Sequence, residues 1–559
     1  MDALNRGRNS LTAATGLVLF AVLYYALMYR YGLNLADEGS VALISQRLMH
    51  GERPFREVIT GYNVLWFYPI SALFRVFGSN LLYMREYFYA ISTGSALIAF
   101  FLLRRLDAPV WLAFVQGVMV ISINGQYFKA YIPFLVLANL FAITLFLTSQ
   151  RKTLASLGAG ILLGTTYLIR IDIGMFYTVV WLFVILLHAI LLNRRLRVNL
   201  MAAGYLAIGA VVMHLPFLYD AYHRRFLPGF LDQYLNVAAI IATPITSHWQ
   251  IFGPTKPSSV PPTALANSGA PSEQAAAQKP PSLLQRRHFQ DIFSKSLSVE
   301  KRLLAFLTYV PPALICLLGI AGIYVVLIKR ISPERWLLSS ALLAGCLSAF
   351  PQFFFFRPDL PHLIEFMNGG LVAITCAGWI LWSSQSNARS SIFFAAAIAI
   401  TEMAYVCLAF VSPYGGTILV RINRTMEFRG SNGVDVFLNR TEYDEVDSLF
   451  KATVLNSSKK DYVAGYPYLP GVNFIAARPT FQSTLYVDDM AHPPDWEQTE
   501  IARIKKYRPA VIIIDDWKVN GTEQSRFTHW AAQLTKFVES NYRSVGVVSG
   551  KTVFARLTP

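Results

Sequence analysis

Long apolar runs alternate with short polar segments along most of the chain. A helix needs about 20 apolar residues to cross the hydrocarbon core of a bilayer. Runs of roughly that length predict about eleven membrane-spanning helices, at 11–30, 86–103, 108–123, 131–149, 154–170, 173–192, 199–217, 303–327, 336–356, 363–383 and 391–411. The pattern therefore predicts a mainly α fold, a polytopic transmembrane bundle over residues 1–411.

Two polar stretches inside this bundle are longer than simple loops. The first, 31–85, follows the first span, and we expect it to hold one or two helices along the membrane interface. One of them is residues 64–77, an apolar stretch interrupted by Pro69 and Arg75. The second, 219–302, has a middle part at 253–281 that is rich in Pro, Ser and Ala and is predicted to be disordered.

The C-terminal segment 412–559 is long enough for a small soluble domain. Its apolar run PAVIIID at 509–515 predicts a buried strand, and 544–557 predicts a closing hairpin. Amphipathic helical patterns lie between them. We therefore expect a C-terminal α/β domain.

Basic residues in the short loops predict the orientation of the bundle. With a cytoplasmic N-terminus, the inner loops hold the pairs Arg104/Arg105 and Arg151/Lys152 and further basic residues at 194–197, 329–335 and 389. The short outer loops hold only Lys129, Arg170 and Arg357, as the positive-inside rule requires. The long first outer loop, which includes arginines at 47, 53, 56 and 75, is an exception. The segments 31–85, 219–302 and 412–559 are then all outside.

Composition agrees with a membrane protein. The chain of 559 residues is 54% hydrophobic and 15% charged, whereas soluble proteins contain about 25% charged residues. The net charge of +16 comes mostly from the loops between apolar runs, so we do not expect nucleic-acid binding. All four cysteines lie inside apolar runs, which argues against a zinc site and against disulfides.

Ionisable residues gather at the outer ends of the predicted spans. They are Asp37 and Glu38 after the first span, Lys129 after the third, Arg170 and Asp172 at the end of the fifth, His214 near the end of the seventh, and Arg357, Asp359 and His362 after the ninth. Charged groups at membrane depth are costly, so their presence indicates function. Glu402, in the middle of the last span, is expected to hydrogen-bond inside the bundle.

Such an outer face is suited to sugar transfer from a lipid-anchored sugar phosphate. A carboxylate would act as general base toward the acceptor hydroxyl. Arginine and lysine would bind the donor phosphate and offset the charge that builds on it as it leaves. Two arginines also have simpler possible roles. Arg85, which leads into the second span, could pair with Glu86, and Arg170 could pair with Asp172 between helices. His362 and Glu365 are spaced for a metal but lack further ligands, so no metal or other cofactor is predicted.

Several stretches resemble the GT-C glycosyltransferases, in particular the branch with protein O-mannosyltransferases, lipid A aminoarabinose transferases and lipopolysaccharide-core transferases. The similar stretches are LADEGSVALISQRLMHG at 35–51, GYNVLWFYP at 61–69, LFRVFG at 73–78, GAGILLG at 158–164, RIDIG at 170–174, and GYPYLP at 465–470 with Arg478 and Pro479. The resemblance implies that Asp37 is the catalytic base and that Arg85 is a recurrent arginine of that branch. RPDLPH at 357–362 is similar to motifs of other members, whereas the insert 253–281 departs from the pattern.

We therefore expect an enzyme that moves a sugar from a polyprenyl-phosphate donor to a glycan, lipid or protein acceptor. Asp37 is the expected base, with Glu38 in support. The donor phosphate would be bound by Arg85, Lys129, Arg170 and Arg357, and Asp172, Asp359 and His362 are further site candidates. From the resemblance, the membrane would be a bacterial inner membrane, with the active face periplasmic.

Three other functions fit parts of the pattern. A transporter or flippase for an amphiphilic anion would show internal repeats and polar sites near the midplane, and the sequence shows no repeat. A ligase that moves whole glycans from lipid diphosphates would share the basic outer face but not the early Asp-Glu pair. A non-catalytic member would use its outer domain only to bind a partner.

Overall fold

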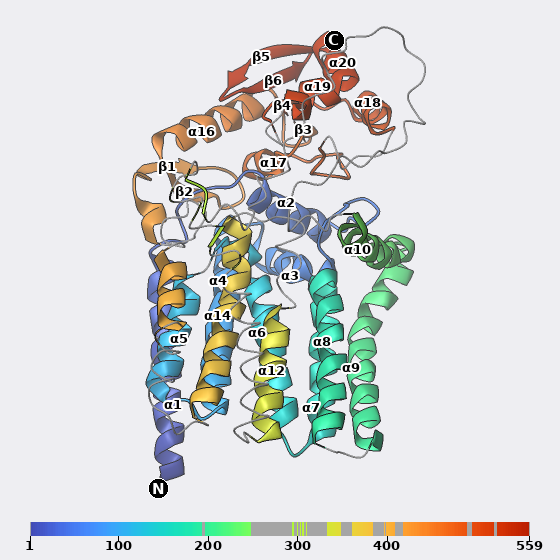
Figure 1. Ribbon diagram of the computed structural model, residues 1–559. Helices are drawn as coiled ribbons and strands as arrows, with labels where there is room; N and C mark the ends of the chain where they lie inside the picture. Colours follow the sequence, from blue (N-terminus) through green and yellow to red (C-terminus); the bar gives the residue numbers. More distant parts are fainter. Residues whose placement is uncertain are drawn as a thin grey trace.

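The structure is a computed structural model in which a bundle of long helices carries the C-terminal region at one end (Figure 1). It describes residues 2–123, 125–192, 196–247, 332–347, 360–383, 398–407, 418–488, 495–518 and 523–557, with isolated positions between 293 and 309 and at 396. The N-terminus lies at the opposite end of the bundle from the C-terminal region.

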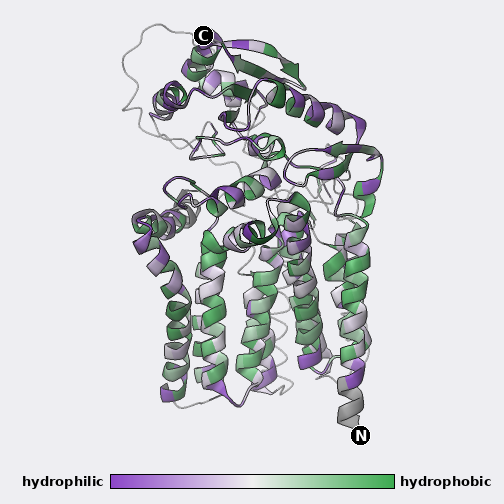
Figure 2. Ribbon diagram, turned by 180° about the vertical axis from the view of Figure 1, so that it is seen from behind, coloured by the Kyte–Doolittle hydropathy of each residue, from purple (hydrophilic) through white to green (hydrophobic). Residues whose placement is uncertain are grey.

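Nine labelled helices run along the bundle in the described part of the chain. They are α1 (Asp2–Ala26), α4 (Leu81–Arg105), α5 (Val110–Ser122), α6 (Tyr131–Thr148), α7 (Lys152–Ile169), α8 (Ile171–Leu191), α9 (Leu196–His223), α12 (Pro333–Leu347) and α14 (Leu360–Trp382). Six of the described helical segments are long and apolar enough to cross a membrane. Apolar residues such as Leu19, Leu23 and Leu186 are exposed on the outside of the bundle, where a bilayer would cover them (Figure 2). The chain is an integral membrane protein.

The first seven expected spans each contain one of these helices, although α5 has only 13 residues. The expected span 303–327 lies outside the described residues apart from isolated positions. The last three are described in part, by α12, α14 and the helical residues 398–407. The total of about eleven spans therefore stays a prediction.

Helices α7 and α9 pack with almost no side chain between them. A Cβ atom on Gly160 would lie 2.1 Å from the backbone oxygen of Leu206, and one on Gly209 would lie 2.4 Å from that of Leu157. Glycine allows two helix backbones to approach this closely, as in membrane helix pairs generally. Helix packing thus explains Gly160 and Gly164 in the glycine-rich stretch 158–164, since a Cβ on Gly164 would lie 2.7 Å from the backbone oxygen of Ala210.

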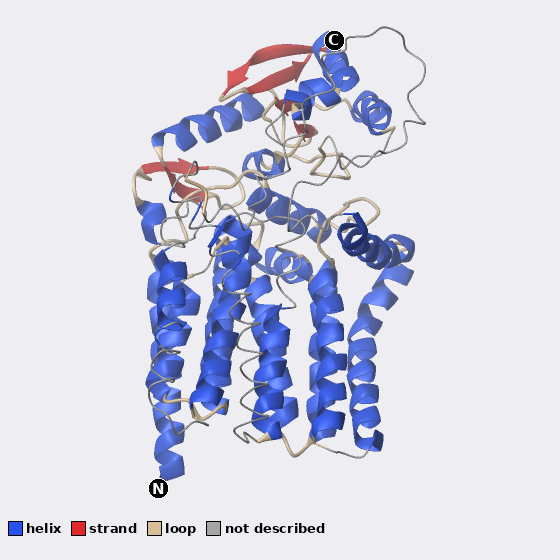
Figure 3. Cartoon of the chain, viewed as in Figure 1, coloured by secondary structure: helices blue, strands red, loops and turns tan. Residues whose placement is uncertain are grey.

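Three further helices of the described chain lie across the end of the bundle that carries the C-terminal region (Figures 1 and 3). They are α2 (Asp37–Met49), α3 (Tyr68–Phe77) and α10 (Leu227–Ser247). The expected interfacial helix at 64–77 consists of a 3₁₀ turn, η1 (Val64–Trp66), followed by α3, whose first turn contains Pro69. Proline is favoured there because the amide that it lacks would have no helical partner. The expected disordered stretch 253–281 lies outside the described residues.

The C-terminal region is α/β over its described residues. Its strands are β1 (Met426–Arg429), β2 (Asp435–Leu438), β3 (Val463–Tyr466), β4 (Val511–Asp515), β5 (Tyr542–Val548) and β6 (Lys551–Arg556). Its helices are α16 (Arg440–Leu455), α17 (Pro470–Ala476), α18 (Trp496–Tyr507), α19 (Phe527–Trp530) and α20 (Ala532–Asn541), with short 3₁₀ turns η5 (Ile418–Arg421) and η6 (Glu523–Ser525). The main sheet has the order β3-β4-β6-β5, with β3 and β4 parallel and the other neighbours antiparallel. The strand expected at 509–515 and the hairpin expected at 544–557 are both present.

Helix α17 attaches this region to α2 by direct backbone contact. The amide of Gly471 donates to the carbonyl of Leu35 at 2.7 Å. A Cβ on Gly39 would lie only 2.3 Å from the Cα of Gly471. Because neither residue has a side chain, the first turn of α2 lies directly against the C-terminal region. Residues 37 and 38 belong to that turn.

Candidate active site

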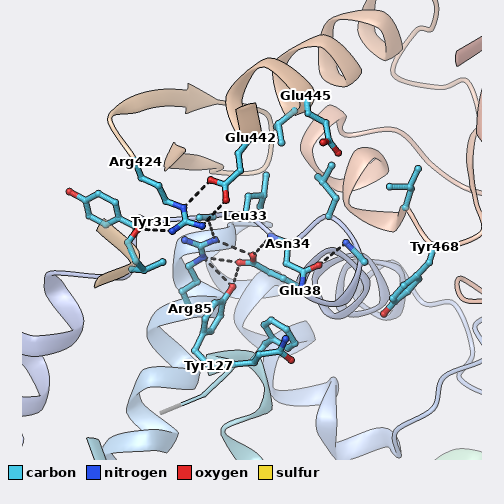
Figure 4. A pocket seen from close by; sticks show the side chains of 18 of the residues that line it. Tyr31, Leu33, Asn34, Glu38, Arg85, Tyr127, Arg424, Glu442, Glu445 and Tyr468 are labelled. Carbon is cyan, nitrogen blue, oxygen red and sulfur yellow. Dashed lines mark hydrogen bonds and ion pairs between the residues drawn. The ribbon is translucent and has the colours of Figure 1, made fainter. Parts of the chain in front are cut away.

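A cavity of about 480 Å³ lies between the end of the bundle and the C-terminal region (Figure 4). Both parts of the chain contribute polar and aromatic side chains to its wall. These include Asn34, Glu38, Arg85, Gln126 and Tyr127 from the bundle end, and Arg424, Glu442, Glu445, Tyr468, Asp515, Trp517 and Lys551 from the C-terminal region. The cavity thus exists only where the two parts meet.

Glu38 and Arg85 form a buried ion pair in the wall of this cavity. The Nε of Arg85 lies 2.7 Å from Glu38 Oε1, its Nη2 lies 3.1 Å from Oε2, and both side chains are at most 2% exposed. The Tyr127 hydroxyl also donates to this carboxylate. The guanidinium donates further to the carbonyls of Tyr29 and Gly32, each at 2.7 Å. Arg85 therefore joins the end of α1 to the start of α2.

Asp37 has different surroundings, although it is the next residue to Glu38. Its backbone amide and that of Ala36 each donate to Asn34 Oδ1 at 2.9 Å, which fixes the first turn of α2. Its half-buried carboxylate accepts a hydrogen bond from the Tyr468 hydroxyl at 3.0 Å. Within the described chain, no Arg, Lys or His lies within ion-pair distance of Asp37. Asp37 itself is not among the residues that line the cavity, but its chain neighbours Ala36 and Glu38 and its hydrogen-bond partner Tyr468 are.

Tyr468 is held as a hydrogen-bond donor to Asp37. Burial raises the pKa of the Tyr468 hydroxyl well above its usual range, and the nearby Asp37 carboxylate raises it further. The Tyr468 phenol therefore keeps its proton at neutral pH and can donate it in a hydrogen bond to the Asp37 carboxylate. It also orients that carboxylate.

Arg170 and Asp172 form a second ion pair at the junction of α7 and α8. The guanidinium meets the carboxylate through two hydrogen bonds, of 2.9 and 2.6 Å. It also lies over the Tyr62 ring, 5.2 Å from the centroid, and Tyr62 stacks on Trp66. The predicted ion pair between Arg170 and Asp172 is therefore present, and it lies where α7 meets α8.

Lys129 forms a third pair with Glu365 of α14, at 3.3 Å, and both side chains are buried. Beyond this ion pair, neither carboxylate oxygen of Glu365 makes a hydrogen bond to the described residues. The described residues contain no group of three or more His, Cys, Asp or Glu that could hold a metal. Glu365, considered above as a metal ligand with His362, is instead the partner of Lys129.

The three described candidates for phosphate binding are therefore each neutralised by a carboxylate. Arg357 and Asp359 lie outside the described residues, as does the side chain of His362, whose backbone belongs to α14. The predicted gathering at one end of the bundle is confirmed for the described residues, because Asp37, Glu38, Lys129, Arg170 and Asp172 all lie at the end that carries the C-terminal region.

Two other polar residues have structural partners. His214 Nε2 lies 2.9 Å from the Tyr234 hydroxyl of α10, which attaches that helix to α9. Glu402 accepts a hydrogen bond from Thr375 at 2.5 Å, so it is bound within the bundle as expected.

Sequence reasoning missed the C-terminal side of the cavity. Tyr468 lies inside the motif GYPYLP, which carried part of the resemblance but gave no role to the tyrosine. Asp515 ends the apolar run at 509–515, and a polar residue at the carboxyl end of a strand is a usual place for a functional group. Glu445 and Lys551 had no signal of their own, since each looks like an ordinary surface charge.

No family model and no curated protein matches the chain. Among solved structures, ArnT from Cupriavidus metallidurans in the apo state is similar over 98% of each chain, with a TM-score of 0.51 and 13% identity. The chain therefore shares the overall fold of this ArnT. The oligosaccharyltransferase of Archaeoglobus fulgidus, in complex with Zn and sulfate, aligns with 97% of this chain and 73% of its own, with a TM-score of 0.46 and 12% identity. At 13% identity the likeness to ArnT concerns the fold, and the chemistry has to be argued from the side chains.

Proposed function

We propose that this protein is an integral-membrane glycosyltransferase that moves a sugar from a polyprenyl-phosphate donor to an acceptor hydroxyl, with Asp37 as general base. The reaction would take place on the periplasmic side of a bacterial inner membrane. The GT-C fold supports the transferase over a transporter. The position of the polar cavity at one end of the bundle supports a reaction at the membrane surface.

The contrast between Asp37 and Glu38 is the observation that carries the proposal. Glu38 is buried and bound to Arg85, so its charge is already used in the fold. Asp37 has a single neutral donor, Tyr468, and is half-buried next to residues that line the cavity. A general base needs an accessible carboxylate oxygen in fixed orientation, and Asp37 meets that condition.

The proposed reaction is a displacement at the anomeric carbon of the donor sugar. Asp37 accepts the proton of the acceptor hydroxyl as that oxygen forms a bond to the anomeric carbon. The bond between this carbon and the phosphate oxygen breaks, and the electron pair leaves with the polyprenyl phosphate. Tyr468 keeps the carboxylate oriented during the proton transfer. The products are the glycosylated acceptor and polyprenyl phosphate.

Binding of the donor phosphate is proposed for the basic residues around this site. Because Lys129 and Arg170 are already paired with Glu365 and Asp172, a phosphate would meet neutral ion pairs there. Two ion pairs without net charge attract an anion only weakly at long range. Phosphate binding would therefore rely on hydrogen bonds from the Arg170 guanidinium and the Lys129 ammonium group. Arg357 is the remaining candidate from the sequence.

Replacing Asp37 with asparagine tests the proposal. The amide keeps the shape and can still accept from Tyr468, but it cannot take up the proton. We expect transfer of radiolabelled sugar from polyprenyl-phosphate donors to fall by about 10²–10⁴-fold. The control is Asp444→Asn, which removes an exposed carboxylate on α16. Undiminished transfer by a correctly inserted Asp37→Asn protein would show that Asp37 is not the base.

A further inference from the structure

Three residues of the C-terminal region form a charged cluster in the cavity wall. Lys551 at the start of β6 lies 2.9 Å from Glu445 of α16 and 3.4 Å from Asp515 at the end of β4. Lys551 and Asp515 are also cross-strand partners in the sheet. Trp517 follows two residues after Asp515, lines the same cavity and is half exposed. The cluster therefore joins an ionic group to an open aromatic face.

On the side of the C-terminal region, the charge of the cavity wall does not suit an anion. This side of the wall contains three carboxylates, of Glu442, Glu445 and Asp515, against two cations, of Arg424 and Lys551, so it has one excess negative charge. Each of those cations already lies within ion-pair distance of a carboxylate. A phosphate or carboxylate group entering here would meet excess negative charge at short range, which is repulsive.

The same wall suits a ring with hydroxyl or amino groups. Carboxylate oxygens accept hydrogen bonds from such groups, and the lysine ammonium can donate to their oxygens. Aromatic rings present apolar faces against which the carbon face of a ring can pack, and Trp517 and Tyr468 both line the cavity. An amino group would gain a further attraction to the indole face.

The position of the cluster favours the acceptor over the donor. A polyprenyl tail must lie beside apolar helices, which keeps the donor phosphate at the end of the bundle. Glu442 and Glu445 lie across the cavity from Arg85 and Tyr127, on the side of the C-terminal region (Figure 4). Asp37 lies between two lining residues of the bundle side, Ala36 and Glu38, and is bound to a lining residue of the C-terminal region, Tyr468.

We infer that Glu445, Asp515, Lys551 and Trp517 form an acceptor subsite for a sugar unit without phosphate. The inference rests on the proposed transferase function, because it assigns one side of that site to the acceptor. A purely structural cluster, which would only join α16 to the sheet, would contact no ligand and would show no preference among sugars.

Sugar binding to the purified full chain in nanodiscs tests the subsite. The probes are methyl glucoside, the methyl glycoside of glucosamine, and glucose 6-phosphate, followed by saturation-transfer NMR. We expect both glycosides to bind about tenfold more tightly than the phosphate. Trp517→Ala should weaken glycoside binding about three- to tenfold. Glu445→Lys should remove the discrimination against glucose 6-phosphate, whereas the control Asp444→Lys on the same helix should leave it unchanged.

Several outcomes would overturn the inference. These are equal or tighter binding of glucose 6-phosphate to the wild type, no detectable binding of either glycoside, or no effect of Trp517→Ala and Glu445→Lys in proteins with wild-type thermal unfolding. The measurements are repeated with Asp37→Asn, because binding needs no proton transfer. If the Asp37→Asn variant binds the glycosides selectively and also transfers sugar at the wild-type rate, the subsite is supported and the proposed base is refuted.

Discussion

Two adjacent carboxylates take different roles because of the side chains around them. Asp37 and Glu38 share the first turn of α2, where the helix dipole favours negative charge. Glu38 binds Arg85 and Tyr127 and becomes part of the fold, whereas the Asp37 carboxylate accepts a hydrogen bond from Tyr468 alone among the described residues. A resemblance in sequence can mark the pair, but the partners decide which member is available for chemistry.

The Tyr468 hydroxyl is predicted to position Asp37. Tyr468→Phe removes a hydrogen bond to a charged group, which is worth about 1.5–3 kcal/mol. We expect kcat to fall about 10- to 100-fold with little change in the donor KM. Because its raised pKa keeps Tyr468 protonated below pH about 10, the ratio of wild-type to variant rates should be constant from neutral pH up to that point.

The control for this measurement is Tyr507→Phe, which removes an exposed hydroxyl at the end of α18. A Tyr468→Phe protein with the wild-type kcat would contradict the positioning role. A change confined to the acceptor KM would also contradict it, since it would indicate that Tyr468 contacts the acceptor only.

The Arg85–Glu38 pair is predicted to stabilise the fold. Arg85→Met leaves a buried carboxylate without its partner, which costs about 3–5 kcal/mol. The double variant Arg85→Met with Glu38→Gln removes both charges and should recover a large part of that loss. Thermal unfolding in detergent measures both. Equal destabilisation of the single and the double variant would show that Arg85 acts through packing and its carbonyl contacts instead of through the ion pair.

At the scale of elements, glycines allow backbones to make contacts that side chains would prevent. The α7–α9 pair and the contact between α2 and α17 both depend on them. The first holds the bundle together. The second fixes the turn that contains Asp37 against the C-terminal region, so the geometry of the site depends on the packing of two elements far apart in sequence.

Two alanine substitutions on α7 test the close helix packing. A Cβ on Gly160 would overlap the Leu206 carbonyl, whereas one on Gly158 would have no atom within 4 Å. We expect Gly160→Ala to destabilise the protein by about 1–3 kcal/mol, as overpacking does. Gly158→Ala should be neutral or slightly stabilising, because alanine is the better helix former. Similar unfolding temperatures for the two variants would refute the close contact.

At the scale of the whole molecule, the candidate site and the basic loops lie at opposite ends of the bundle. Arg104 donates to Ser10, and Arg105 to Thr148, at the opposite end of the bundle. The basic loops thus lie together at the N-terminal end, as the orientation rule predicts. The candidate site lies at the other end, beneath the C-terminal region.

Cysteine labelling tests which face is outside. In a background without the four native cysteines, Leu557→Cys places an exposed thiol at the end of the C-terminal region. We expect a membrane-impermeant maleimide to label it in intact spheroplasts. Asn9→Cys, at the exposed start of α1, should react only after the cells are opened. The reverse pattern would put the proposed active face in the cytoplasm and contradict the orientation.

The sequence by itself determined the features that depend on local composition. Apolar runs predicted the first seven bundle helices, and the run 509–515 predicted β4, because burial in lipid or in a sheet requires such runs. The same pattern predicted that Asp37, Lys129 and Arg170 lie at the outer ends of the spans. Those features follow from segment length and hydrophobicity, without knowledge of what each segment packs against.

Only the tertiary structure decided the partner of each charge. The hydrogen bond from Tyr468 to Asp37 joins residues 431 positions apart, and the Lys129–Glu365 pair joins the loop before α6 to α14. Such pairings follow from how the elements pack, and their geometry cannot be deduced from the spacing of residues along the chain. For that reason the sequence marked Asp37 and Glu38 together, whereas the fold distinguished the open carboxylate from the paired one.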